Sequence, residues 1–294
     1  MTGEHDAAPR GPALAGLVAG ACIIGFVPAA VRLADAGPAA IGFWRLAFAL
    51  PLLVLLNRRS LRKGAAPPVL ALVAGAMFAL DLAFWHYGIA YTSVANATVL
   101  ANLTPLVVTL IAWIFLGQRP ARLFLAAVAI AVAGAALMAL GKGGPPGRAP
   151  LLGDLLSAAT AIWYALYMIS IGQARKESGA GAVMLWSTVS AMPVLLAAAL
   201  ILDEALLPAT PMGWTACAVL GLLHVCGQGA IAWALGRLPT ATASVVVLIQ
   251  PVVAALLGWS LFSETPGPLQ ALGALIALGG VVLAQWATRP RAPA

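Results

Sequence analysis

Four ionisable side chains lie inside long apolar stretches of the sequence, where a charge would be costly if lipid surrounded it. They are Arg45, Asp81, His86 and His224. Placing a charged side chain at the centre of a membrane costs about 2.5–3.5 kcal/mol on insertion scales, so such residues commonly mark an ion or substrate pathway. Asp81 could take up and release a proton, and so could His86, because the reference pKa of histidine is about 6.5. Both are candidate proton-coupling groups.

Each of these two residues also has a structural interpretation. Asp81 could form a buried ion pair with Arg45, which we interpret as structural or interfacial because it lies near the start of its apolar stretch. His86 could contact a substrate, or it could donate a hydrogen bond between two helices. The sequence leaves both pairs of alternatives open.

A polar stripe follows in the next apolar stretch. Thr98, Asn102, Pro105 and Thr109 recur at i, i+4, i+7 and i+11, so a helix would place them on one face. Asn102 could bind a zwitterionic substrate, with Thr98 beside it. The alternative is that Thr and Asn join helices by hydrogen bonds, as they do in membrane bundles. Pro105 and Pro251 each remove a backbone N–H and predict a kink or hinge.

Two further sets of residues could form the wall of a cavity. Trp163 and Tyr167 are spaced i, i+4 with Tyr164 between them, about ten residues inside their apolar stretch. Their rings would suit an apolar or aromatic substrate, although ordinary packing is the alternative. His224 and Gln228 are also spaced i, i+4, which favours a cavity wall over a lipid-facing surface. Weaker candidates of the same kind are Tyr87, Gln250 and Trp233.

The composition of the chain indicates which structural elements position these residues. Of 294 residues, 62% are hydrophobic and 9% charged, against about 25% charged in an ordinary soluble domain. Cutting at Pro, Gly and charged clusters gives ten stretches near the length of about 20 residues that crosses a bilayer. They are residues 13–34, 39–56, 69–90, 94–116, 121–140, 152–172, 180–202, 212–235, 240–262 and 267–286. The sequence therefore predicts an all-α integral membrane protein with ten transmembrane helices.

The distribution of Lys and Arg predicts the orientation. With the N-terminus inside, the inner segments hold twelve of them and the outer loops three, namely Arg32, Lys142 and Arg148. Because short cytoplasmic loops carry the excess of basic residues, both termini should be cytoplasmic. The net charge of +7 is spread over these loops and not gathered into a patch, so we expect no nucleic-acid partner.

The sequence repeats itself. A shift of 146 residues places Pro105 on Pro251, and it also superposes Trp113 on Trp259, Pro120 on Pro266 and Gly134 on Gly280. We therefore predict two five-helix repeats, residues 1–140 and residues 141–294. An odd number of spans makes the second repeat enter the membrane from the opposite side, and inverted repeats suit alternating access around a midplane site.

Specific stretches resemble a known family. Residues 87–98 read YGIAYTSVANAT, followed by LTPL at 103–106 and WIFLGQRP at 113–120. A second copy reads ALGRLPTATAS at 234–244, QP at 250–251 and FSETP at 262–266, while FWR occupies 43–45. These stretches resemble the drug/metabolite transporter superfamily and its EamA-type ten-helix exporters. Gln118 departs from the glutamate usual in the family, whereas Glu264 keeps it.

The resemblance implies a secondary transporter that exports small metabolites, and one branch of the family exports aromatic amino acids. We expect amino acids, aromatic or otherwise apolar, or amphipathic compounds as substrates. The alternatives are a lipid or lipid-carrier flippase of the same fold and an uncoupled facilitator. The sequence contains no nucleotide-binding motif, metal-ligand spacing or catalytic motif. We therefore expect no enzyme activity, metal or cofactor. We expect a protein of the bacterial inner membrane in which one chain suffices for transport. Its other partners would be lipid and protons.

Overall fold

The structure is a computed structural model that describes residues 10–62, 66–92, 97, 100–117, 119–140, 149–262 and 267–287. Within these residues the regular structure is helical and contains no strand. The first half contains α1 (Arg10–Ile24), α2 (Val27–Leu33), α3 (Pro38–Arg62), α4 (Val69–Tyr91), α6 (Thr104–Leu116) and α7 (Arg122–Leu140). The second half contains α8 (Pro150–Glu177), α9 (Ala180–Ile201), α10 (Pro211–Leu223), the π-helix η1 (His224–Gln228), α11 (Gly229–Leu235), α12 (Thr240–Val246), α13 (Ile249–Phe262) and α14 (Pro268–Ala287).

Eight helical stretches in the described part of the chain are long and apolar enough to cross a membrane. They correspond to the first three predicted spans and the last five. The fourth and fifth predicted spans correspond to the shorter apolar helices Thr104–Phe115 and Arg122–Leu137. Part of the fourth predicted span, including Thr98, lies outside the described residues. The all-helical membrane architecture is confirmed, and the number ten stays a prediction.

Two of the helices begin at the prolines singled out in the sequence. Helix α6 starts at Thr104, directly before Pro105, and α13 starts at Ile249, two residues before Pro251. Proline cannot donate to the carbonyl four residues earlier. At the second site the N–H of Gln250 takes over and donates to the carbonyl of Val247 at 2.9 Å. Both prolines therefore stand at breaks in the helical path, and their role as hinges stays a prediction.

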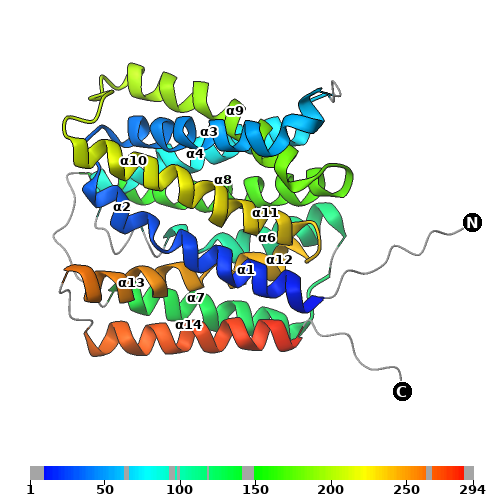
Figure 1. The fold of residues 1–294 in the computed structure, drawn as a ribbon. Coiled ribbons are helices and arrows are strands. Elements are labelled where there is room, and N and C mark those ends of the chain that lie inside the picture. Colours follow the sequence, from blue (N-terminus) through cyan, green and yellow to red (C-terminus); the bar gives the residue numbers. More distant parts are fainter. Residues whose placement is uncertain are drawn as a thin grey trace, which may run out of the picture.

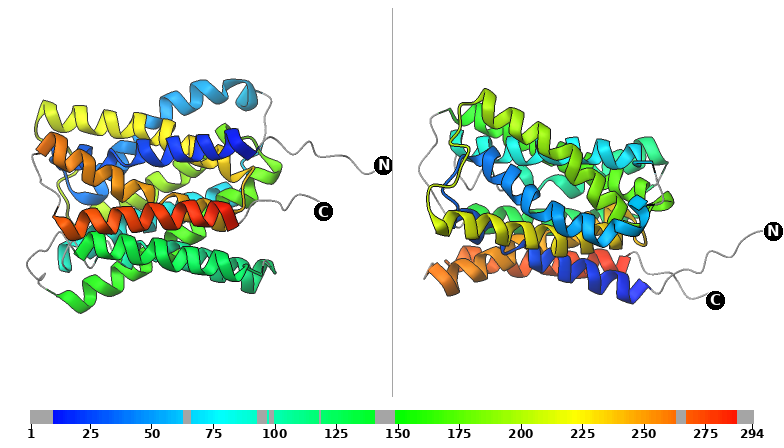
Figure 2. Two further views of the ribbon diagram at one scale, coloured as in Figure 1. Left: turned by 90° about the horizontal axis from the view of Figure 1, so that it is seen from below. Right: turned by 45° about the horizontal axis from the view of Figure 1, so that its top comes forward.

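The helices run roughly alongside one another in a bundle (Figure 1). Helices α3, α4, α8 and α9 pack together in one part of it, and α7 packs along α14 at the opposite side (Figures 1 and 2). The start of α1 and the end of α14 lie at the same end of the bundle (Figure 1). A chain that crosses the membrane an even number of times has both ends on the same side, whichever side that is.

Contacts between the two halves recur with the halves exchanged. The 146-residue shift relates α3 to α9, α4 to α10 and α7 to α14. Helix α3 packs on α9, and α7 packs on α14, so each of these helices pairs with its own counterpart. Helix α4 also packs on α9, and its counterpart α10 packs on α3. Reciprocal contacts of this kind are typical of two units related by a two-fold axis.

The contact between α7 and α14 shows the same reciprocity residue by residue. Gly134 on α7 lies against the backbone of Ala277 on α14, and Gly280 on α14 lies against the backbone of Ala131 on α7. The same shift of 146 residues converts each of these contacts into the other. A Cβ atom at either glycine would collide with backbone atoms of the facing helix. We call these four residues the glycine seam.

Candidate functional site

A cluster of aromatic and charged side chains fills the interior between α3, α4, α8 and η1. The guanidinium of Arg45 lies 5.5 Å from the centre of the Phe78 ring, within the range of a cation–π contact. Phe78 is 5.0 Å from Tyr167 and 5.6 Å from His224, measured between ring centres. Tyr164 stacks on Tyr167 at 5.7 Å. We call these five residues the central cluster.

The cluster ends in neutral hydrogen-bonding groups. The hydroxyl of Tyr164 is directed at the side-chain amides of Gln228 on η1 and Gln250 on α13. It makes no well-aligned hydrogen bond with a described residue. One ring nitrogen of His224, Nε2, pairs with the hydroxyl of Thr188 at 3.1 Å. This end can therefore donate and accept hydrogen bonds without carrying a fixed charge.

Many polar atoms of this interior are buried without a hydrogen-bond partner among the described residues. In the cluster and beside it they are Nε and Nη2 of Arg45, the Tyr164 hydroxyl, Nδ1 of His224, Oε1 of Gln228 and Nε2 of Gln250. Further examples are both ring nitrogens of His86, Nδ2 of Asn102 and Nε1 of Trp163. A buried polar atom without a partner costs about 1–3 kcal/mol, so proteins rarely accumulate them without a purpose. Their concentration here is typical of a site that a ligand completes.

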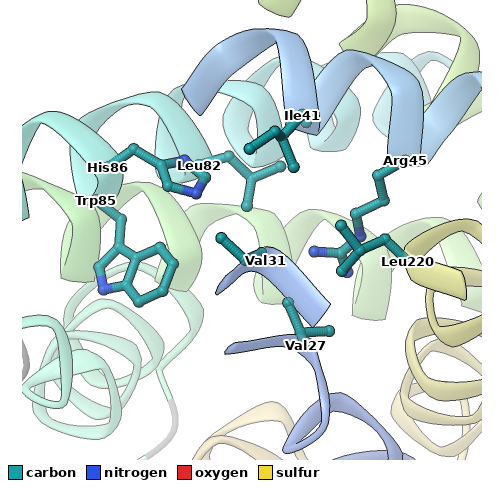
Figure 3. A pocket seen from close by; sticks show the side chains of 9 residues that line it. Val27, Val31, Ile41, Arg45, Leu82, Trp85, His86 and Leu220 are labelled. Atoms are coloured by element: carbon teal, nitrogen blue, oxygen red, sulfur yellow. The ribbon is translucent and has the colours of Figure 1, made fainter. Parts of the chain in front are cut away.

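A small pocket adjoins the cluster (Figure 3). Arg45 of α3 borders it on one side, His86 and Trp85 of α4 border it on the other, and Val27 and Val31 of α2 line it between them. Its free volume is about 20 Å³, which is room for a water molecule and too little for an amino acid. Helices would have to move apart before a metabolite could enter.

Asp81 lies on α4 near Arg45, and the two charges interact electrostatically. Their nitrogen and oxygen atoms nevertheless do not approach within the 4.0 Å of a direct salt bridge. The structure therefore shows an electrostatic interaction without a direct salt bridge, and the structural interpretation of Asp81 stays a prediction. Because Asp81 is buried near Arg45, it remains a candidate coupling group.

One end of the bundle is tied together by Glu204, which lies in the loop 202–210 between α9 and α10. Its carboxylate accepts the backbone N–H groups of Ala39, at 2.9 Å, and Ala40, at 3.0 Å, in the first turn of α3. It also accepts the hydroxyl of Tyr87 near the end of α4. A carboxylate at a helix N-terminus satisfies N–H groups that have no partner within the helix. Glu204 thus connects α3, α4 and the loop.

Two further contacts hold the same loop. The indole N–H of Trp44 donates to the carbonyl of Leu206 at 2.8 Å. Asp35, between α2 and α3, interacts with the side chain of Thr210 and accepts the N–H of Ala209 at 3.1 Å. These hydrogen bonds, that of Thr210 first, hold the pKa of the Asp35 carboxyl below its usual value. We call the loop 202–210 with its contacts the loop latch.

We expect Glu204→Gln to loosen the loop latch, because an amide retains one acceptor oxygen where the carboxylate has two. Hydrogen bonds to a charged group contribute about 1.5–3 kcal/mol each, so a loss of about 1–2 kcal/mol in the free energy of unfolding is expected. Thermal unfolding of the protein in detergent measures it. The control is Asp203→Asn, the same isosteric change at the neighbouring exposed residue. Equal melting temperatures for the two variants would contradict the latch.

The structure brings together some predicted site residues and separates others. Tyr164, Tyr167, His224, Gln228 and Gln250 converge on the central cluster, and His86 lines the adjoining pocket. Tyr87 belongs to the loop latch instead.

Trp163 and Tyr167, which could together form one wall of a cavity, contact different aromatic residues. Tyr167 stacks on Tyr164, whereas Trp163 meets Phe84 edge-on, with 5.8 Å between ring centres. Phe78 also contacts Tyr167, with 5.0 Å between ring centres. Trp233 likewise stacks under the guanidinium of Arg237 at 4.1 Å, outside the cluster.

The structure describes only part of the polar stripe. Thr98 lies outside the described residues. Asn102 precedes α6, and its side-chain nitrogen is buried without a partner in the described part of the chain. The hydroxyl of Thr109 donates to the carbonyl of Pro105 at 2.6 Å, so its hydrogen bond lies within α6.

Sequence reasoning missed two members of the site. Phe78 had no distinguishing neighbour in the sequence, although it contacts Arg45, Tyr167 and His224. Arg45 was interpreted as structural or interfacial, yet it is 5% exposed and borders the pocket. Its signal was available: an arginine seven residues inside a helix that begins at Pro38 lies about 10 Å from the helix end.

Long apolar helices around a buried polar interior define the class of multi-pass membrane proteins and are common in transporters. The chain matches the EamA-like transporter family over residues 11–140 and again over residues 151–286, and it therefore belongs to that family. The family resemblance found in the sequence is confirmed. Membership points to a transporter that moves a small molecule, and not to an enzyme.

Two curated relatives and a solved structure are similar to this chain. Two curated relatives, both named pseudopaline exporter CntI and both from strains of Pseudomonas aeruginosa, are 29% identical to the chain over 243 residues. The match covers 81% of this chain and 83% of each relative. A solved crystal structure matches with a TM-score of 0.79 at 18% identity, over 96% of this chain and 100% of the other, which shows the shared fold.

Proposed function

We propose that this protein is a secondary transporter of the inner membrane that exports a small amphipathic metabolite, with amino acids as the first class to test. The proposal rests on the set of buried polar atoms around the central cluster that have no hydrogen-bond partner among the residues that the structure describes. An aromatic surface flanked by such atoms suits a molecule with an apolar body and polar ends. The relatives are named as exporters, which supports the outward direction.

Alternating access is the mechanism we propose. It is supported by the reciprocal contacts of the two halves, because halves that are equivalent by symmetry can exchange conformations. The small volume of the pocket supports it as well, since a substrate could enter only after helices separate. With both termini cytoplasmic, as the distribution of Lys and Arg predicts, the loop latch would close the outward path. Pro105 and Pro251 would then supply hinges.

The experiment is counterflow into proteoliposomes that contain the purified protein, with a panel of labelled amino acids and with or without a pH gradient. We expect saturable movement of aromatic or branched amino acids, and a reduction of about tenfold or more in the double variant Trp163→Ala, Asn102→Ala. Dependence on the gradient that disappears in Asp81→Asn would support proton coupling through Asp81. Unchanged gradient dependence in that variant would exclude it.

The same panel separates the alternatives. Movement without any dependence on the pH gradient would identify an uncoupled facilitator. If no amino acid moves and fluorescent lipid analogues cross the bilayer instead, the protein is a flippase and the proposal fails.

A further inference from the structure

We propose that Arg45 binds a carboxylate of the transported molecule and thereby makes the protein selective for organic acids or zwitterions. The inference rests on the proposed transport function and adds the chemical class of the substrate. It gives Arg45 a role as a specificity-determining residue in place of the structural role that the sequence indicated.

Burial is the first reason. Arg45 is 5% exposed, and its guanidinium lies against the face of Phe78 at 5.5 Å. The ring contact positions the guanidinium without a hydrogen bond, and it leaves N–H groups available. A buried arginine is normally paired with a carboxylate or with several carbonyl groups, because burying an unpaired charge is costly. Here Asp81 acts on it electrostatically without forming a direct salt bridge.

The identity of the unpaired nitrogens is the second reason. Nε and Nη2 of Arg45 are both buried without a hydrogen-bond partner in the described part of the chain. These two nitrogens form one edge of the guanidinium and present two parallel N–H groups. That edge matches the two oxygens of a carboxylate, which it can bind through a pair of hydrogen bonds.

The surroundings favour a carboxylate over a more highly charged anion. Arg45 and Asp81 act on each other electrostatically, and Arg45 is the cation of this interaction. Tyr164, Gln228 and Gln250 contribute neutral polar groups, and the imidazoles of His224 and His86 also lie within electrostatic reach of Arg45. A phosphate dianion would need more than one cation, whereas a single carboxylate on a zwitterion is matched by one arginine and one nearby acid.

The shape of the cluster suggests how the rest of the molecule lies. Successive ring contacts connect Arg45 to Phe78, Phe78 to Tyr167 and Tyr167 to Tyr164. The Tyr164 hydroxyl lies near the amides of Gln228 and Gln250. A carboxylate held at Arg45 would place an apolar body along the rings.

The test compares an amino acid with its amide, in which a neutral carboxamide replaces the carboxylate and the amino group is kept, in counterflow with the full-length protein. The probes are tryptophan and tryptophan amide, which share the same aromatic body, and protein-free vesicles correct for leakage of the amide. We expect the protein to move the acid about tenfold faster than the amide or better. Arg45→Gln should reduce the rate for the acid by about tenfold or more and leave the rate for the amide unchanged, because the lost hydrogen bonds involve only the carboxylate. Arg58→Gln, at the exposed end of the same helix, is the matched control and should behave as the parent protein.

Three outcomes separate this inference from the proposed function. If Arg45→Gln moves tryptophan and tryptophan amide with the same ratio of rates as the parent protein, the role of Arg45 is overturned. The transporter proposal would still stand. Should Arg45→Gln fail to fold, competition in the parent protein decides: inhibition of counterflow by the amide as strong as that by the acid would also overturn it. If neither these compounds nor any other member of the panel moves, the transporter proposal fails and the inference fails with it.

Discussion

We expect Gly280→Leu to prevent the formation of a stable protein. Gly280 is buried on α14, and a Cβ atom there would collide with the backbone of Ala131 on α7. Backbone atoms cannot rotate away as a side chain can, so the two helices would have to separate along their length. Overpacking in a well-packed interior usually costs about 1–3 kcal/mol, and a clash of this kind belongs at or above the upper end. The melting temperature in detergent and the yield of monodisperse protein would both fall.

The neighbouring residue supplies a matched control. Gly279 is exposed, and a Cβ atom added there would meet nothing within 4 Å. Gly279→Leu should therefore melt close to the parent protein. Similar losses in both variants would show that any glycine in α14 is needed, and they would contradict the close approach at the seam. Gly134→Leu should reproduce the effect of Gly280→Leu, because it faces Ala277 in the same way.

Gln228→Met should make the protein more stable and less active. Oε1 of Gln228 is buried without a hydrogen-bond partner among the described residues, and methionine has a similar length without a strongly polar atom. Removing an unsatisfied acceptor should raise the free energy of unfolding by about 1 kcal/mol. If the amide contacts substrate, transport should fall by about tenfold at low substrate concentration. Opposite changes in stability and activity are typical of residues that a protein keeps for function.

Gln270→Met serves as the comparison for this variant. Gln270 is 7% exposed on α14, outside the central cluster, and its substitution should leave transport unchanged. Transport by Gln228→Met at the parent rate over the whole concentration range would exclude contact between Gln228 and the substrate. A lower melting temperature would show that the amide contributes to packing.

The helical fold was predictable because its signal is spread over many residues. Apolar stretches of about 20 residues and a scarcity of charges indicate membrane helices whatever the details of packing. The 146-residue shift also superposed Gly134 on Gly280, and these two residues occupy equivalent contacts in the structure. The repeat was thus detectable from a few residues that the packing constrains.

The site was only partly predictable, because it depends on which helix faces of distant segments meet. Spacing placed His224 and Gln228 on one face, and both are buried in the interior. Spacing could not show that Phe78 fills the gap between Arg45 and Tyr167, or that Glu204 reaches the first turn of α3. These contacts join segments up to 165 residues apart in the chain, and no local pattern encodes them.

The glycine seam gives each half a surface that is complementary to its own counterpart, as in the interface of a symmetric homodimer. The covalent connection between Leu140 and Ala149 would then join what two separate half-length polypeptides could also assemble, and co-expressed halves should associate through this seam. The same geometry restricts how the sequence can drift. A side chain at Gly134 or Gly280 would meet backbone atoms of the facing helix, which no substitution there can remove, so accepted changes at these two positions should be rare in either half.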